Sequence, residues 1–273
     1  NTGGVATLVG DPPNVLIASY ASARGLGFGF MSFIYHLTPL AIIAWGATLW
    51  YMHRHFKNWR EVKPQNVEEV TNEDEWDAVK NDTLMYRTLG ALAVTVIMFA
   101  AVELLHLDLE ISAVSLGGAG IAMSISMIGV PHEKRMDIHE VIHKVEWGAL
   151  LFFAGLFIMV GGLEAMGYLE AVAYMIFDNF GPDGNIHNDP VVLVIVLIWI
   201  SAIASAIVDN IPFCAAMLPV IEEIGRLSDG AVEIIPLYWA LAIGCGFGGN
   251  ATPIGSSANV MTIAISERGG HKI

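Results

Sequence analysis

A twelve-residue pattern occurs twice in this chain, once near each end. Residues 3–14 read GGVATLVGDPPN and residues 248–259 read GGNATPIGSSAN. Counting the valine that follows each copy, seven positions are identical at a constant offset of 245 residues. Both copies interrupt apolar segments with glycine, threonine and asparagine, which are poor helix formers. The pattern therefore predicts two broken helices at corresponding places of an internally repeated fold, where transporters build their binding sites.

The composition is that of a membrane protein. Of the 273 residues, 55% are hydrophobic and 15% are charged, whereas a soluble domain carries about 25% charged residues. Several apolar runs reach the ~20 residues that a membrane-spanning helix needs. The sequence therefore predicts an all-α polytopic membrane protein embedded in a lipid bilayer. A net charge of −14 without a basic stripe excludes a nucleic-acid partner.

The apolar segments predict a series of helices of different lengths. We expect a short half-helix at residues 12–20 and four spans at 30–52, 89–105, 111–128 and 147–165. An amphipathic helix is expected at 168–180, and a long apolar run at 191–221 is broken at 208–212. A final broken helix is expected at 235–247 with 260–265.

Lysine and arginine predict which side of the membrane each loop occupies. The loops 53–87 and 129–145 carry nine of these residues and are assigned to the cytoplasm, while the loops 106–110 and 180–190 carry none. A re-entrant hairpin at 191–221, turning at Asp209 and Asn210, places eleven of the thirteen inside and leaves Arg24 and Arg226 outside. Pro212 supports a turn there. Glu222 and Glu223, which follow the hairpin, are expected to meet water.

This orientation makes the two motifs an inverted pair, because the chain runs outward through the first and inward through the second. Residues 1–52 are then the end of a first inverted repeat, and residues 53–88 are a cytoplasmic acidic linker with eight acids in 61–82. Residues 89–273 form most of a second repeat, with scaffold spans at 89–165, the re-entrant hairpin at 191–221 and a broken helix at 235–265.

Unwound backbone carbonyls, together with hydroxyl and amide oxygens, make a suitable cage for Na⁺. A single such motif is also explained by a glycine kink for helix packing, but two copies at identical spacing favour a binding role. The residues expected to bind ion or substrate are Gly4, Thr7, Asp11, Asn14, Asp209, Asn210, Gly248, Gly249, Asn250, Thr252, Ser256 and Asn259. The Na⁺ candidates among them are Asp209, Asn210, Thr252 and Asn259.

Asp209 is the most informative single residue of the hairpin. A carboxylate at the bilayer centre costs at least ~2.5–3.5 kcal/mol, so it usually marks a function. Bound protons and bound Na⁺ would compete for such a group. The alternative is a helix-capping aspartate at a turn. Asp11 presents the same choice, because it directly precedes Pro12 and could cap the half-helix that begins there.

These motifs, with VDNIPF inside an apolar hairpin, resemble the arsenite permease/sodium–proton antiporter superfamily (ArsB/NhaD type), which includes P protein permeases and citrate and dicarboxylate carriers. The resemblance implies two inverted repeats, each giving a re-entrant hairpin and a broken helix to a mobile transport domain, and a scaffold domain that forms a homodimer. It implies a hairpin tip at 209–212 and loops at 3–14 and 248–259. We expect a fragment, because the partner hairpin of the first motif would precede residue 1 and a closing helix would follow residue 273.

The function expected first is exchange of a small inorganic ion, Na⁺ for H⁺, across the inner (plasma) membrane, with these ions as coupling ions and no other cofactor. An arsenite or antimonite efflux permease and a Na⁺-coupled citrate or dicarboxylate carrier remain alternatives. The inverted pair disfavours a passive channel. An enzyme is not expected, because an intramembrane hydrolase using Ser256 or Ser257 needs a histidine base, and His36 alone lies well inside a span.

Overall fold

The computed structural model describes residues 1–56, 79, 81–107, 109–128, 138–143, 145–182 and 189–268. The chain divides into two compact units, described separately below. The first, Asn1–Ile42 with Glu146–Ile273, contains both motifs and is called the motif unit; the second is Ile43–Val145. Most of the predicted acidic linker lies outside the described residues. The predicted division into inverted repeats stays a prediction.

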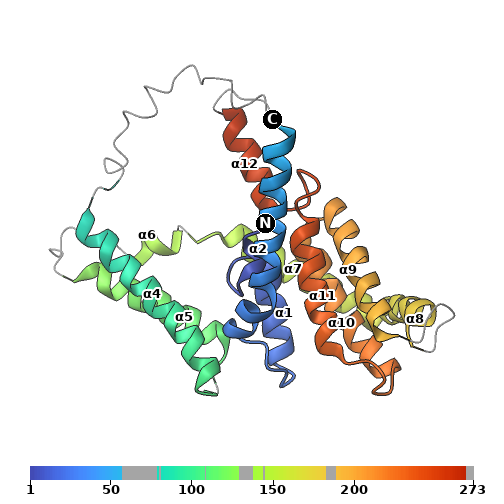
Figure 1. The fold of residues 1–273 in the computed structure, drawn as a ribbon. Coiled ribbons are helices and arrows are strands. Elements are labelled where there is room, and N and C mark those ends of the chain that lie inside the picture. Colours follow the sequence, from blue (N-terminus) through green and yellow to red (C-terminus); the bar gives the residue numbers. More distant parts are fainter. Residues whose placement is uncertain are drawn as a thin grey trace. The chain divides into compact units, whose positions relative to one another are not determined.

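The motif unit is built from helices of very different lengths (Figure 1). In chain order they are the single turn η1 (Gly4–Ala6), α1 (Pro12–Ser22), the first half of α2 (Phe30–His55), α7 (Trp147–Ala165), α8 (Tyr168–Phe180), α9 (Pro190–Ile207), α10 (Asn210–Leu227), α11 (Ile234–Gly248) and α12 (Ser257–Arg268).

The second unit holds the rest of α2 with α4 (Asp82–Leu104), α5 (Ile111–Met127) and α6 (Ile138–His143). The helices α4 and α5 pack against each other. Gly118 of α5 lies directly on Thr95 of α4, where a Cβ would overlap the threonine side chain. Arg87 donates to the carbonyl of Ile128 at the other end of this pair. Small residues such as Gly118 let two membrane helices approach closely.

Three described helices are long and apolar enough to cross a membrane, namely α2, α4 and α9. A fourth crossing is possible if α7 and α8, which meet at a bend of 68°, form one broken span. Large apolar side chains on these helices face outward; Ile158 of α7, for example, is 76% exposed. Outward apolar surface on helices of this length is what a lipid environment requires. The protein is therefore an all-helical polytopic membrane protein, as the sequence predicted.

The core of the motif unit is the group α9, α10 and α11, which lie side by side in Figure 1. Gly244 and Gly248 of α11 lie so close to α9 that a Cβ at Gly248 would overlap the backbone of Ala202. Ser205 of α9 donates to the carbonyl of Cys245 at 2.8 Å. α10 also contacts α1, α7 and α8, so it is the central helix of the unit.

Most of the predicted helix boundaries agree closely with those observed, but α4 begins at Asp82, earlier than the predicted residue 89, and α6 was not among the predicted helices. Helices α7 and α8 have the predicted limits, and the long apolar run divides at Val208 and Asp209, both of which are outside the helices on either side. The role expected of Pro212 was wrong in detail. It lies in the first turn of α10, where a backbone N–H has no intrahelical partner to lose. Pro212 therefore helps α10 to begin rather than breaking a helix.

Candidate ion-binding site

The first motif folds into a short loop that closes on the beginning of α1. The amide NH₂ of Asn14, in the first turn of α1, donates to the carbonyls of Gly4, Val5 and Thr7 at 3.2, 3.3 and 2.9 Å. The backbone N–H of Gly10 donates to Thr7 at 3.2 Å. A Cβ on Gly10 would overlap the carbonyl of Gly4, so this position requires glycine. We call residues 3–11 the first loop.

The second motif repeats most of these hydrogen bonds, but has no counterpart, among the described residues, of the bond from Asn14 to Val5. Asn259 donates its amide to the carbonyls of Gly249 and Thr252 at 2.7 and 3.0 Å, and the N–H of Gly255 donates to Thr252 at 3.3 Å. These atoms correspond to those of the first motif at the same offset of 245 residues. We call residues 248–256 the second loop. The repeated glycine, threonine and asparagine positions are thus explained first by the loop conformation that they share.

The hairpin tip meets the first loop through a buried amide and a buried carboxyl group. Asn210 lies 1% exposed and Asp11 7% exposed. The Nδ2 of Asn210 donates to Oδ1 and Oδ2 of Asp11 at 3.5 and 3.3 Å. One turn further on, the thiol of Cys214 lies 3.7 Å from the carbonyl of Pro13. The helices α1 and α10 therefore begin side by side.

The two acids of the predicted site have different environments. Asp209 is partly exposed, and its Oδ1 accepts from the backbone N–H of Ile211 at 3.0 Å, so it caps α10. Asp11 occupies the capping position of α1, but its side chain makes no capping bond and faces Asn210 instead. The capping alternative thus describes Asp209, and Asp11 is the buried carboxyl group of the site.

The second loop is joined to the first residue of the chain. Asn1 donates from Nδ2 to Oδ1 of Asn259 at 3.3 Å and accepts from the hydroxyl of Ser256 at 2.9 Å. Thr252 donates to the carbonyl of Ala206 at the end of α9. Sequence reasoning missed Asn1 because it lies two residues before the repeated pattern, and the matching position, Gly246, has no side chain.

The remaining predicted residues divide into those at the meeting point and those away from it. Gly248 and Gly249 are buried where α11 ends, whereas Asn250 is exposed and donates to the carbonyls of Gly246 and Phe247 at 3.4 and 3.1 Å. Binding by any of these residues stays a prediction.

The serine–histidine arrangement of a hydrolase is not assembled in the described part of the chain. The hydroxyl of Ser256 donates to Asn1. His36 stacks on Trp239 with ring centroids 4.8 Å apart, and its Nδ1 lies 2.8 Å from the carbonyl of Ser32. A nucleophile of this kind requires a base within hydrogen-bond reach, and these two side chains have other partners.

Five helix ends converge where the two loops and the hairpin tip meet. The helices α9 and α11 end there, and α1, α10 and α12 begin there. Helix N-termini carry partial positive charge and C-termini partial negative charge. Broken helices in transporters present both kinds of terminus to substrate and coupling ions. The arrangement can therefore bind a small charged species.

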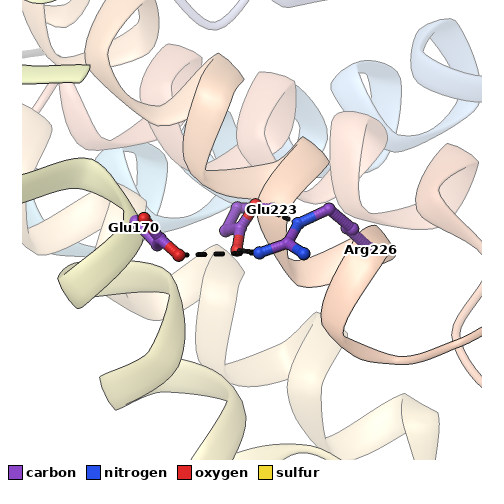
Figure 2. Close-up of polar contacts among 3 residues, drawn as sticks. All are labelled: Glu170, Glu223 and Arg226. Carbon is purple, nitrogen blue, oxygen red and sulfur yellow. Dashed lines mark hydrogen bonds and ion pairs between the residues drawn. The ribbon is translucent and has the colours of Figure 1, made fainter. Parts of the chain in front are cut away.

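Away from this meeting point, α10 is attached to its neighbours by ion pairs. Figure 2 shows Arg226 of α10 with dashed lines to Glu223 of the same helix and to Glu170 of α8. Its Nε donates to Glu223 at 2.8 Å, and its Nη2 lies 3.5 Å from Glu170. The hydrogen bonds to Glu223 raise the pKa of the Arg226 guanidinium above its ordinary range, so the group stays charged.

A second ion pair joins α10 to α1 and the turn that follows it. Glu222 accepts from the hydroxyl of Tyr20 at 2.8 Å and forms an ion pair with Arg24. The guanidinium of Arg24 also lies 3.5 Å above the ring of Tyr20. The two arginines that the sidedness argument left outside, Arg24 and Arg226, are thus both neutralised by glutamates of α10.

Membrane-crossing helices interrupted by paired polar loops define the class of membrane proteins to which secondary transporters belong. Within it, the chain belongs to the citrate transporter family, whose profile matches residues 1–244. It is 38% identical to an uncharacterized transporter of Mycobacterium tuberculosis over all of this chain and 58% of that protein. It is 35% identical to a 46 kDa membrane protein of Mycobacterium leprae, covering 59% of it.

More distant similarity extends to animal proteins. The P protein of Sus scrofa is 29% identical over 342 aligned residues, which cover 99% of this chain and 39% of the P protein. The chain thus spans less than two thirds of the length of these relatives, at most 59%. The resemblance to the permease superfamily predicted from the motifs is confirmed, and the chain is part of a membrane transporter family.

Proposed function

We propose that this chain is the ion-binding part of an ion-coupled secondary transporter whose central group is the Asp11 carboxyl group. The single observation that carries the proposal is the burial of Asp11 against Asn210 at the point where five helix ends converge. An ionisable side chain at membrane depth is costly and is usually retained for transport or proton transfer.

The function that this arrangement supports best is exchange of a small cation, Na⁺, for H⁺ across the plasma membrane. A carboxyl group can hold either a proton or a cation, and binding of one excludes the other. Asp11 takes the central role that the sequence suggested for Asp209, because Asp209 is engaged in capping α10. The amide of Asn210 orients the Asp11 carboxyl group without adding charge.

A polycarboxylate such as citrate is the second candidate, and two observations favour it. The family is described as citrate transporters. The start of α12 is capped by a neutral group, since Oγ of Ser256 accepts from the N–H of Ala258 at 3.3 Å. A helix N-terminus that no protein carboxylate caps can attract the carboxylates of a substrate through its partial positive charge. The N-termini of α1 and α10, in contrast, already have the carboxyl groups of Asp11 and Asp209.

The scaffold-mediated homodimer remains part of the proposal. In the second unit, outward apolar side chains such as Leu116, which is 75% exposed, need lipid or a second copy to cover them.

The test is transport by the full-length parent protein in proteoliposomes. Proton movement is followed with a pH-sensitive dye while Na⁺, Li⁺, citrate or arsenite is supplied. Cation exchange predicts alkalinisation or acidification driven by Na⁺ alone, and a carboxylate carrier predicts uptake of labelled citrate. Asp11→Asn should reduce either activity to the level of empty liposomes. Full activity of this variant, at equal reconstituted protein, would remove Asp11 from the centre of the mechanism.

A further inference from the structure

Thr38 of α2 forms a hydrogen bond that differs in kind from those of other helical threonines in this chain. Its hydroxyl donates to the carbonyl of Ala6 in η1 at 2.8 Å, across 32 positions of the sequence. A threonine inside a helix commonly donates to the carbonyl four positions earlier in the same helix. Four described threonines do so, namely Thr48, Thr88, Thr95 and Thr262. Thr38 therefore connects α2 to the first loop rather than to its own helix.

The bond from Thr38 completes the hydrogen bonding of the turn at residues 4–7. The amide of Asn14 donates to three of the four carbonyls of this turn. The fourth carbonyl, that of Ala6, accepts from Thr38 instead. All four carbonyls are therefore bonded to side chains, three of them to α1 and one to α2.

The same turn lies directly against the residues that precede α1. A Cβ on Gly4 would be 2.8 Å from the carbonyl oxygen of Gly10 and 3.3 Å from the Cβ of Asp11. Closely packed groups transmit a displacement to their neighbours, because little free space is left between them. A shift of η1 would therefore also displace Asp11.

The helix α11 holds this turn from a further side. Val5 is fully buried, and a Cβ on Gly246 of α11 would overlap the Val5 side chain. Three helices thus fix η1: α1 through the amide of Asn14, α11 through its packing on Val5, and α2 through the hydroxyl of Thr38.

We propose that Thr38 is a positioning residue of the transporter, which holds the Ala6 carbonyl and thereby fixes η1 and the place of the Asp11 carboxyl group. It acts on Asp11 through the backbone of the first loop and not on the transported species. This inference rests on the proposed function of Asp11 and extends the machinery to α2, where the sequence indicated no binding residue. Because one neutral hydrogen bond is a small contribution, its loss should weaken apparent affinity rather than abolish transport.

The experiment compares three variants of the full-length parent protein in proteoliposomes. Thr38→Val keeps the branched shape and removes the hydroxyl, whereas Thr38→Ser keeps the hydroxyl. Thr48→Val is the matched control, because Thr48 lies in the same helix and donates at 2.8 Å to Ala44, within that helix. The measurements are Na⁺-driven proton movement and uptake of labelled citrate, each as a function of concentration and at equal folded protein.

The expected result is a change in KM with kcat largely retained. Thr38→Val should raise KM of the transported species by about fivefold, the factor that one neutral hydrogen bond represents. Thr38→Ser should restore KM, and Thr48→Val should leave both constants unchanged. A residue with only a structural role would lower the melting temperature and the folded yield, but would leave KM of the folded protein as in the wild type.

Hydrogen exchange provides a readout that does not depend on transport. Loss of the bond to Ala6 should speed backbone amide exchange in peptides covering residues 3–14 in Thr38→Val but not in Thr48→Val. Unchanged exchange in these peptides, unchanged KM in Thr38→Val, or an equal rise of KM in Thr38→Ser would each overturn the inference. Should Thr38→Val give no folded protein, Thr38→Ala takes its place in both measurements.

The outcomes also separate the role of Thr38 from the proposed function. If Asp11→Asn abolishes transport while Thr38→Val keeps the wild-type KM, the function stands and the positioning role is wrong. If Asp11→Asn transports normally, the proposed function falls, and the role of Thr38 falls with it even where the first loop exchanges faster.

Discussion

The two ends of α10 are both attached to α1, but by interactions of opposite character. At the start of α10, Asn210 donates to Asp11, and both side chains are buried. Near its far end, Glu222 binds Tyr20 and Arg24 through side chains that are about one third exposed to solvent. The first contact joins two groups that are shielded from solvent, and the second joins charges that water can reach.

This difference in burial predicts how strongly each end of α10 responds to a change of charge. A buried polar group that loses its partner costs its full desolvation penalty, whereas an exposed ion pair contributes about 0–1 kcal/mol. The start of α10 is therefore sensitive to any change of charge. The far end tolerates change. Its ion pairs attach α10 to the turn after α1 and to α8.

The largest effect is expected from Asn210→Asp. This change places a second carboxylate at hydrogen-bond distance from Asp11 and removes the amide donor, leaving uncompensated buried charge that costs about 3–5 kcal/mol. The full-length parent should lose most of its folded yield by size-exclusion chromatography and fluorescence-detected melting. Asn250→Asp is the control, because Asn250 is an exposed asparagine of the second loop. Equal melting temperatures for the two variants would contradict the burial of this contact.

The two acids near the start of α10 should respond differently when they lose their charge. Asp11→Asn is expected to fold but to lose coupled transport, since the carboxyl group itself is replaced. Asp209→Asn keeps a capping side chain for α10, because asparagine caps helices as well as aspartate does, and should retain most transport. The measurement is ion-driven flux in proteoliposomes at equal protein. The reverse order of activities would restore Asp209 as the central carboxyl group.

A moderate effect is expected at the far end of α10 from Glu222→Gln. Glutamine can still accept from the Tyr20 hydroxyl, but it cannot form an ion pair with Arg24. The expected loss is about 0.5–1 kcal/mol of stability, smaller at high salt. A double-mutant cycle with Arg24→Met isolates the pair. A coupling energy as large as the effect of Asn210→Asp would mean that the two ends of α10 are not different in kind.

The smallest effect is expected from Arg226→Met. Its pair with Glu223 lies within one helix and its contact with Glu170 is long and exposed, so transport should be unchanged and any shift in melting temperature should vanish in high salt. Glu170→Gln should behave in the same way. A transport defect in either variant at unchanged melting temperature would give this cluster a role beyond attachment.

Local sequence patterns were sufficient to predict most of the helices and the breaks between them, but not α6 or the first turns of α4. The apolar runs predicted α7 and α8 with their observed limits, and the glycines of both motifs predicted the two loops. The offset between the motifs also predicted that the loops would fold alike. These features depend on residues close together in the sequence, such as Asn14 and the carbonyls 7 to 10 positions before it, so the pattern carries the information.

The partners of the polar side chains could not be predicted in the same way. The sequence favoured Asp209 over Asp11, and it expected Glu222 and Glu223 to meet water without naming partners for them. In the structure, Asp209 caps its own helix, Asp11 faces a residue 199 positions away, and the two glutamates pair with arginines. Which of two neighbouring acids is buried depends on how α10 packs on α1, and no periodicity in either helix encodes that contact.

The sequence by itself therefore determined an all-helical membrane protein with two broken-helix loops of related sequence, because hydrophobic length, glycine and proline act locally. The tertiary structure alone decided that the loops are not equivalent in their surroundings. It brings Asn210 to Asp11 and Asn1 to Ser256 and Asn259. The two loops differ in their surroundings because the side chain that meets each comes from a distant segment, and only packing determines which segment that is.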